Sequence, residues 1–397
     1  MTTFTANTSF FSGDFNLSQI AALKNGFKFT DNVNKIIDGV TYQDIAAYSF
    51  RFPFAQIPGD TSAYFRGTDL TVSAAEKLTG GTITGMGFYT GSIGDLSIPD
   101  WQIKGIKVAA TDIAAVMATG SPADDTKFFA SLFTGDDTVN LSPSYDLFNG
   151  RGGNDLINGN GGDDTLYGGD GNDKLYGGTG ADQLEGGAGD DILAGGNGID
   201  TASYLLATTS VTVNLSITTQ QDTGGAGKDT LTSIERLYGG KAGDTLTGTD
   251  GNNEILGMNG ADVIDGRGGN DLIYGELGKD KLTGGAGADK FLFHTPPGPG
   301  NVDTITDFSH AQGDKIVLSS LTYEAFYGKG GSVLAQAEFY KAPGATAAHD
   351  ADDHIIYNTT NGNLYYDADG MGGTAAVLVA TLQGHPTLLY SDIMLDF

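Results

Sequence analysis

The sequence predicts an all-β-dominated protein whose middle part is a parallel β-roll, and two observations support this prediction. A nine-residue, glycine-rich unit repeats from residue 150 to 203 and again, in its own unbroken phase, from 239 to 292. In almost every unit the sixth residue is Asp, and two places later an aliphatic or aromatic residue follows. We expect a mostly-β N-terminal domain with short helices before the roll and a β-rich C-terminal cap after it.

The nine-residue unit itself explains why a roll should form. Glycines permit positive φ, so the first six residues can curl tightly. The last three are too few for a helix but enough for a short strand with one residue facing inward. Two units then make one turn, and successive turns stack as parallel strands around a narrow core. A disordered Gly/Asp-rich linker is the alternative, and the regularly spaced apolar residues argue against it. These inward residues are Ile157, Leu166, Leu175, Leu184, Leu193 and Ala202, then Leu246, Ile255, Ile264, Ile273, Leu282 and Phe291.

The sixth place of each unit is the candidate metal ligand. Curled loops can aim backbone carbonyls and an Asp carboxylate at one point, and ligands that are all oxygen suit a hard cation. The pattern G-G-x-G-x-D-x-U-x is already known as a calcium-binding repeat. We therefore predict several calcium ions as the cofactor. The candidate ligands are Asp137, Asp146, Asp155, Asp164, Asp173, Asp182, Asp191 and Asp200, then Asp244, Asn253, Asp262, Asp271, Asp280 and Asp289.

On these residues the chain resembles the RTX family, the hemolysin-type calcium-binding repeats of proteins exported by type I secretion. The resemblance covers roughly residues 137–397 and implies that each calcium lies between units i and i+2. Asn253 departs from the pattern, and with one neutral oxygen its site with Asp271 should be weak or empty. The implied pairs are Asp155–Asp173, Asp164–Asp182, Asp173–Asp191, Asp182–Asp200, Asp244–Asp262, Asp262–Asp280 and Asp271–Asp289, with Asp137–Asp155 and Asp146–Asp164 as possible extensions.

Five segments follow along the chain. They are an N-terminal domain of unknown activity at 1–133, the first repeat block at 134–203, an insertion at 204–238, the second block at 239–292, and the cap with a secretion signal at 293–397.

The N-terminal domain should contain strands at 50–54, 82–84 and 102–108 and short helices at 112–118 and 124–133. The insertion, with strands at 211–215 and 229–237, should add a wider pair of turns to the roll. A hinge is the competing interpretation of the insertion.

The region after the repeats carries further expectations. Residues 302–308 and 314–318 resemble the strands that cap the roll in serralysin-type RTX proteins. Residues 355–358 and 363–367 should form a hairpin around Asn361 and Gly362. The acidic and apolar end at 392–397 resembles a type I secretion signal, and an ordinary last strand is compatible with it.

Composition limits the partners. The formal net charge of −28 repels nucleic acid and anionic lipid headgroups. The chain has no cysteine, no visible N-terminal signal peptide and no segment long enough to span a membrane. We therefore expect an extracellular or cell-surface protein, exported by the type I secretion machinery without an N-terminal signal peptide.

Catalytic motifs are not found. Neither His-Glu-x-x-His nor Gly-x-Ser-x-Gly occurs, and all five histidines lie at or after His294. Weaker candidates are a transition-metal site at His349 and His354 and a calcium site at Asp367 and Asp369. A glycosidase-like carboxylate pair would have to come from residues such as Asp69, Glu76, Asp95 and Asp100.

We predict a secreted, calcium-folded structural or cell-surface protein and no enzyme. A surface-layer, matrix or adhesion component fits, which would self-associate or bind a cell-surface glycan. The alternative is an extracellular enzyme or polysaccharide-binding protein with its active domain in residues 1–133.

Overall fold

The computed structural model describes residues 133–141 and 143–396 with their side chains and, before them, eight strands as backbone. The chain divides into two compact units, Met1–Gly198 and Ile199–Phe397, and each unit is described by itself. The eight N-terminal strands are β1 (Thr3–Ala6), β2 (Phe27–Thr30), β3 (Lys35–Ile37), β4 (Val40–Tyr42), β5 (Asp44–Phe50), β6 (Thr61–Val72), β7 (Leu78–Thr90) and β8 (Trp101–Ala109).

These N-terminal strands form an antiparallel sheet. Strands β2, β5, β6, β7 and β8 pair in that order, β1 follows beside β8, and β3 pairs with β4. The strands predicted at 82–84 and 102–108 lie within β7 and β8 and are confirmed. The predicted segment 51–54 and both predicted helices fall outside the described residues, apart from Phe133 at the end of the second helix.

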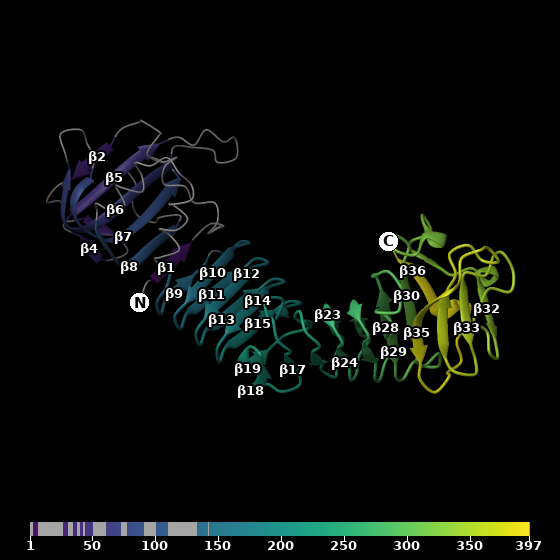
Figure 1. Ribbon diagram of the computed structural model, residues 1–397. Helices are drawn as coiled ribbons and strands as arrows, with labels where there is room; N and C mark the ends of the chain where they lie inside the picture. The colour runs from purple at the N-terminus through teal and green to yellow at the C-terminus, as the bar shows by residue number, and fades with distance from the viewer. Residues whose placement is uncertain are drawn as a thin grey trace. The chain divides into compact units, whose positions relative to one another are not determined.

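The repeats of the first unit form two parallel stacks of strands (Figure 1). One stack consists of β9, β11, β13 and β15 in that order, and the other of β10, β12 and β14. The pairing Leu156↔Lys174 is shifted by one eighteen-residue turn, as the sequence predicted. The strands are β9 (Thr138–Asn140), β10 (Leu147–Gly152), β11 (Leu156–Gly161), β12 (Thr165–Asp170), β13 (Lys174–Thr179), β14 (Gln183–Ala188) and β15 (Ile192–Asn197).

The core of this roll is the predicted row of inward residues. Every eighth-place side chain from Val139 to Leu193 has 0% of its surface exposed. In β11 the residues on either side of the inward Ile157 point outward and remain partly accessible, and the other strands follow this pattern except at Glu185 in β14, which is buried. The roll is therefore one side chain wide on each face, and its folding depends on what the curled loops bind as well as on apolar burial.

The second unit continues the same architecture. Strands β16, β20, β22, β25 and β28 form one parallel stack, and β17, β21, β24 and β27 form the other (Figure 1). The strands are β16 (Thr201–Ser203), β17 (Thr212–Asn214), β18 (Gln221–Gly224), β19 (Gly227–Thr232), β20 (Arg236–Tyr238), β21 (Thr245–Thr247), β22 (Glu254–Leu256), β23 (Asn259–Gly260), β24 (Val263–Asp265), β25 (Leu272–Tyr274), β26 (Leu277–Gly278), β27 (Lys281–Thr283) and β28 (Lys290–Phe293).

Within this unit the insertion supplies strands to both stacks. Strand β17 pairs in parallel with β21, and β20 pairs with β16 and β22. Leu231, Ile234 and Leu237 are buried, as predicted. The single strand predicted at 229–237 is wrong, because the chain turns at Ser233, whose φ is 53°, and separates β19 from β20. Strand β19 instead makes an antiparallel hairpin with β18.

After the repeats the two stacks gain further strands. Strand β29 pairs with β27, and β30 pairs with β28, so the predicted segments 302–308 and 314–318 do contain strands. The last strand, β36, pairs with β30, and the predicted hairpin is the antiparallel pair β33–β34. The elements are β29 (Asp303–Ile305), β30 (Lys315–Ser319), the 3₁₀ helix η1 (Glu324–Phe326), β31 (Ser332–Val333), η2 (Gln336–Glu338), β32 (Phe339–Ala342), β33 (Ile355–Asn358), β34 (Asn363–Tyr366), β35 (Val377–Leu382), η3 (Tyr390–Asp392) and β36 (Ile393–Asp396).

Candidate metal centre

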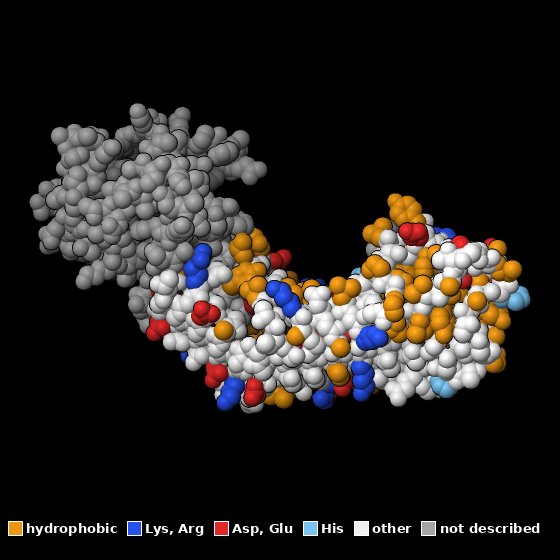
Figure 2. Space-filling view, viewed as in Figure 1, with side chains coloured by type: hydrophobic (Ala, Val, Ile, Leu, Met, Phe, Trp, Pro, Cys, Tyr) orange, Lys and Arg blue, Asp and Glu red, His pale blue; other side chains and the backbone are white. Residues whose placement is uncertain are grey.

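All fourteen predicted ligand residues are buried, although thirteen of them are aspartates. Each lies at the end of a curled loop, immediately before the first residue of the next strand. Burying so many carboxylates without counter-charges is unfavourable. The surface of the repeats in Figure 2 accordingly shows mostly uncharged side chains and backbone, with only scattered acidic groups.

In the first unit each aspartate meets the one two units later. The backbone N–H of Asp155 donates to Asp173 Oδ1 at 2.7 Å, and that of Asp173 donates to Asp191 Oδ1 at 2.8 Å. The same bond links Asp164 to Asp182 at 2.8 Å, Asp137 to Asp155 at 2.7 Å and Asp146 to Asp164 at 2.8 Å. The structure thus brings together the pairs that the resemblance implied here. The pair Asp182–Asp200 would join the two units and stays a prediction.

The second unit repeats this ladder. The bonded pairs are Asp244 to Asp262 at 2.7 Å, Asn253 to Asp271 at 2.7 Å, Asp262 to Asp280 at 2.8 Å and Asp271 to Asp289 at 2.9 Å. In every case the donor is the backbone N–H of the earlier residue, and the acceptor is Oδ1 of the later one. The spacing of eighteen residues is the same throughout.

The second carboxylate oxygen is where the ladder lacks protein donors. A buried oxygen without a donor loses its hydration and gains nothing in return, so it calls for a cation or a proton. Buried Oδ2 atoms without a hydrogen-bond partner belong to Asp155, Asp164, Asp173, Asp262, Asp271, Asp280 and Asp289.

The glycine at the first place of each unit keeps the space beside this oxygen open. At Gly168 an added Cβ would collide with Asp173 Oδ2 and with the carbonyl oxygen of Gly186. A carboxylate oxygen and a backbone carbonyl oxygen from neighbouring turns therefore converge where a side chain is missing. Oxygen donors of this kind fit Ca²⁺, which accepts six to eight such ligands in flexible geometry. The residues present fit the predicted ion.

Burial also raises the pKa values of these carboxyl groups. It raises the pKa of Asp155 to about 7 and that of Asp164 to about 8. In the second unit burial raises the pKa of Asp262 to about 8. Hydrogen bonds from the backbone oppose the shift, while neighbouring aspartates of the ladder add to it. Without a cation the ionised ladder is therefore strained electrostatically, and a divalent ion would relieve that strain.

The first two members of the second block differ from the rest. Both oxygens of Asp244 accept protein N–H groups, Oδ1 from Val211 at 2.8 Å and Oδ2 from Gly240 at 2.6 Å. The side-chain oxygen of Asn253 accepts the N–H and the hydroxyl of Thr249, at 2.7 and 3.0 Å. The N–H and O–H donors of the chain here occupy the oxygens that a cation would otherwise bind. This agrees with a weak or empty site at Asn253.

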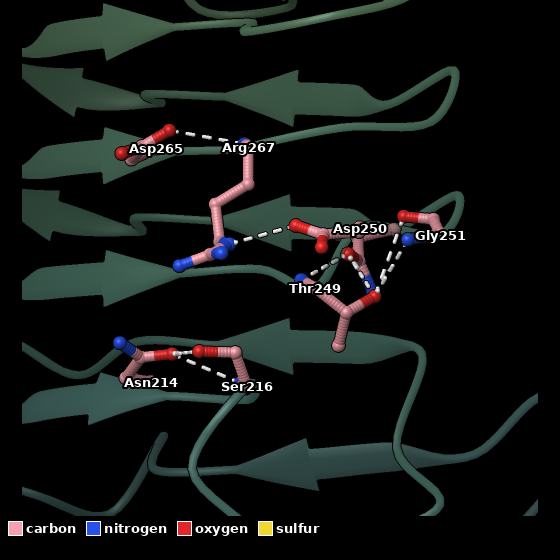
Figure 3. Close-up of polar contacts among 8 residues, drawn as sticks. Asn214, Ser216, Thr249, Asp250, Gly251, Asp265 and Arg267 are labelled. Atoms are coloured by element: carbon pink, nitrogen blue, oxygen red, sulfur yellow. Dashed lines mark hydrogen bonds and ion pairs between the residues drawn. The ribbon is translucent and has the colours of Figure 1, made fainter.

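Beside Asn253 the outer loops hold charges of their own. Arg267, in the left-handed region with φ of 72°, directs Nε to Asp250 Oδ1 at 3.1 Å, and its backbone N–H bonds Asp265 (Figure 3). Thr249 and Gly251 close the adjacent turn (Figure 3). Both side chains of the Arg267–Asp250 ion pair are exposed, so we assign it little stabilising energy.

Three ladder residues were missed by the sequence analysis. Glu235 Oε2 accepts the N–H of Asp200 at 3.0 Å, and Asp303 and Asp314 accept those of Asp280 and Asp289, each at 3.1 Å. The spacings are 35, 23 and 25 residues, so the nine-residue phase does not reach them. The available signal was an acid two places before an apolar residue, as in Asp303-Thr304-Ile305.

The weaker candidates remain separate from the ladder. His349, Asp350 and Asp353 could together place three ligand atoms within 4.8 Å, but His354 instead contacts the carbonyl oxygen of Asp367 at 2.8 Å. The carboxylate of Asp369 accepts the N–H of Thr374, at 3.2 Å. Calcium or transition-metal binding at these places stays a prediction. The carboxylates proposed in the N-terminal domain lie outside the residues whose side chains are described.

Comparison with known proteins decides the family. The profile of the RTX calcium-binding nonapeptide repeat matches four times, at residues 133–166, 167–202, 238–273 and 256–291. The chain belongs to the RTX repeat family. RTX repeats bind several calcium ions, and proteins that carry them are typically secreted by the type I route. The first match begins at residue 133 and includes Asp137 and Asp146.

Two solved structures are similar to parts of this chain. The AlgE6R3 subunit of a mannuronan C5-epimerase from Azotobacter vinelandii is 30% identical, with a TM-score of 0.26, over 39% of this chain and 78% of that one. The extracellular lipase LipA of Serratia marcescens is 20% identical, with a TM-score of 0.24, over 70% of this chain and 49% of that one. No curated protein matches significantly. Among the described residues no helix has the length and hydropathy needed to cross a membrane.

Proposed function

We propose that this RTX protein is a secreted structural or cell-surface component, of the surface-layer, matrix or adhesion type, that folds when it meets extracellular calcium. The observation that carries the proposal is the set of buried Oδ2 atoms without protein donors, which belong to Asp155, Asp164, Asp173, Asp262, Asp271, Asp280 and Asp289. A fold built in this way is stable only when cations complete it. Because ligands bind the folded state, their binding free energy adds directly to its stability.

This dependence suits a protein that is exported before it folds. With 49 acidic and 21 basic residues, the calcium-free chain repels itself and resists collapse, a state that a secretion channel can thread. Extracellular calcium modules bind at Kd values on the order of 10⁻⁴ to 10⁻³ M, far above cytoplasmic calcium levels. Folding is then confined to the outside of the cell.

A surface role is supported by apolar side chains that the C-terminal region leaves exposed. Leu321 is 70% exposed and Tyr327 is 77% exposed, and Val333, in the short edge strand β31, is also exposed. Apolar groups gather over this region in Figure 2. Such patches are typical of contact surfaces, here with further copies of the chain or with a cell-surface glycan.

Electron microscopy of the purified full-length protein tests the proposal. Ordered assemblies or coated surfaces should form in millimolar calcium and disappear on chelation, while circular dichroism confirms that the protein is folded whenever calcium is present. A matched variant, Leu321→Ser with Tyr327→Ser, should stay folded and assemble less. If the folded protein stays monomeric and attaches to no surface, the structural role is wrong.

The second candidate is an extracellular enzyme or polysaccharide-binding protein with its active domain in residues 1–133. This chain and the epimerase subunit are 30% identical, but that likeness covers 39% of this chain and carries no argument about activity. Binding or cleavage of an acidic or neutral polysaccharide by the calcium-loaded protein would favour this candidate.

A further inference from the structure

The loop between β32 and β33 carries a second group of metal-binding side chains, separate from the aspartate ladder. His349 Nδ1 and one carboxylate oxygen each of Asp350 and Asp353 lie within 4.8 Å of one another. The Nδ1 atom is 3.7 Å from Asp350 Oδ2 and 4.0 Å from Asp353 Oδ2. Both distances are too long for hydrogen bonds, so the three groups face one another without bonding to one another.

Other contacts hold each of these side chains in place. The imidazole ring of His349 stacks on the ring of Tyr340, with the ring centroids 5.2 Å apart and the planes inclined by 19°. Asp350 Oδ1 accepts the N–H of Asp352 at 3.1 Å. Asp353 Oδ2 accepts the N–H groups of His349 and Asp350, at 2.9 and 3.0 Å. Supporting contacts of this kind orient the ligands of a metal site before the ion binds.

Each of the three side chains keeps one ligand atom that these contacts do not use. Among the described residues no donor reaches Asp350 Oδ2 or Asp353 Oδ1, and His349 Nδ1 has no hydrogen-bond partner. Asp353 is only 4% exposed, so its carboxylate has lost most of its contact with water. Within the described part of the chain, His349 is also the only ion-pair partner of both carboxylates. A buried carboxylate with an oxygen that lacks a donor calls for a cation.

The donor set indicates the kind of cation. Ca²⁺ binds through oxygen ligands, whereas this group offers one imidazole nitrogen and two carboxylates. Zn²⁺ and similar ions accept nitrogen and oxygen ligands together. His354 takes no such part, because its Nδ1 contacts the carbonyl oxygen of Asp367 at 2.8 Å. The side chains of His349 and Asp350 are 67% and 58% exposed, so a bound ion would keep an open coordination position toward water.

We propose that His349, Asp350 and Asp353 form a binding site for one divalent transition-metal ion of the zinc type. The ion neutralises the two carboxylates and fixes residues 349–353 of the loop between β32 and β33. The site is distinct from the calcium ladder, because one of its ligands is a nitrogen, which calcium does not favour. It adds a binding activity to the proposed calcium-dependent surface role and does not rest on that role.

Zinc titration of the full-length protein in saturating calcium tests this site. Competition with a fluorescent zinc chelator should show one bound zinc ion that a large excess of calcium does not displace. His349→Gln should lose this ion, whereas His385→Gln, which changes another exposed histidine outside the group, should retain it. If no zinc binds, or if His349→Gln binds it as tightly as the unchanged protein, the site does not exist. Circular dichroism in calcium confirms that each variant is folded, so a failure of calcium-dependent folding is distinguishable.

Copper(II) as a probe separates the nitrogen ligand from the carboxylates. An imidazole nitrogen bound to copper splits its electron paramagnetic resonance signal, and this splitting should be absent in His349→Gln. Asp350→Asn should keep the splitting but bind copper and zinc more weakly, because the oxygen remains without its charge. Splitting that survives in His349→Gln would assign the metal to another histidine and overturn the proposal. Undiminished affinity in Asp350→Asn would likewise contradict the three-ligand site.

Discussion

The aspartates of the first repeat block and the opening residues of the second have the same place in the unit but different partners. Asp155, Asp164 and Asp173 each leave a buried oxygen without a protein donor. Asp244 receives N–H groups from Val211 and Gly240 on its two oxygens. The nonapeptide pattern alone therefore does not define a calcium site. What defines it is a carboxylate oxygen that the chain has left without a donor.

The difference arises from the neighbouring sequence. Val211 belongs to the insertion, whose N–H reaches Asp244 across 33 residues and replaces the contact that an earlier repeat would make. At Asn253 the donor is Thr249, four residues before it and at the place of a repeat glycine. At Asn253 a residue that breaks the glycine pattern thus brings donors of its own, whereas at Asp244 the donor to Oδ2 is the repeat glycine Gly240.

Removing calcium should cause the largest difference in folded structure between the first repeat block and the start of the second block. Chelation should abolish most of the β signal of residues 150–292 in circular dichroism, because the ladder would expose or protonate its carboxylates. Millimolar calcium should restore the signal, and magnesium should restore it poorly because it requires tight octahedral geometry. In hydrogen exchange, amides around Asp164 and Asp173 should lose protection at higher calcium than those around Asp244. A spectrum indifferent to chelator would refute ion-dependent folding.

Closing the space beside one carboxylate should have the next largest effect. Gly168 has no positive φ to preserve, so Gly168→Ala acts through the collision of its Cβ with Asp173 Oδ2 and the Gly186 carbonyl. We expect a loss of about 1–3 kcal/mol in the free energy of unfolding in calcium and weaker calcium binding. At Gly152 the nearest atom to an added Cβ is 3.7 Å away, so Gly152→Ala should leave both unchanged. Equal effects in thermal denaturation would show that the space is not a binding site.

Exchanging a charge for an amide should then distinguish the two kinds of aspartate. Asp173→Asn keeps an acceptor for the N–H of Asp155 but removes the charge from the ladder, so calcium affinity should fall about tenfold, or about 1.4 kcal/mol. Asp244→Asn should leave calcium affinity nearly unchanged and instead lower stability with and without calcium, because one of its two N–H donors loses its acceptor. Calcium titration and denaturant unfolding measure the two quantities. Equal losses of affinity would contradict the distinction.

The structure also changes what Asp289 is expected to do. On the nonapeptide phase alone it ends the ladder, so Asp289→Ala should disturb one site and Asp173→Ala two. The hydrogen-bond ladder does continue past Asp289, whose N–H donates to Asp314 Oδ1. Since Asp314 Oδ2 accepts the N–H of Ser309, both oxygens of Asp314 have protein donors, and the contrast between one site and two stays a prediction.

The repeat period predicted most of the roll because the same requirement, burial of one apolar side chain, applies to each unit. An apolar residue every nine places has one way to reach the core, and the register of eighteen follows from two units per turn. The contacts between Asp155 and Asp173 follow from that register. The nine-residue period does not reach Glu235, Asp303 or Asp314, because loops of other lengths bring them into the same row.

Two other features could not be predicted from the sequence, for different reasons. The break between β19 and β20 depends on Ser233 adopting positive φ, which serine rarely does and no local pattern indicates. The donors on Asp244 and Asn253 depend on which backbone N–H groups the insertion and Thr249 direct inward. The N–H groups carry no side-chain signature, so only the fold shows that Asp244 is already satisfied, whereas a weak site at Asn253 was predicted from its neutral side chain.

The smallest expected effect is a gain, from Asn253→Asp. The new carboxylate would face Asp271 across one ladder step and restore the charge of a regular site. Against this, Asn253 Nδ2 donates to the carbonyl oxygen of Glu235 at 3.1 Å, and aspartate would lose that bond, at about 1 kcal/mol. We therefore expect a slightly less stable calcium-free protein that binds at most one more ion, seen by equilibrium dialysis. The double change Asn253→Asp with Thr249→Gly, which restores the repeat glycine and removes the competing hydroxyl, should bind that ion more tightly. If neither variant gains an ion or affinity, the missing charge is not what weakens this step, and the comparison between the two regions must rest on backbone geometry alone.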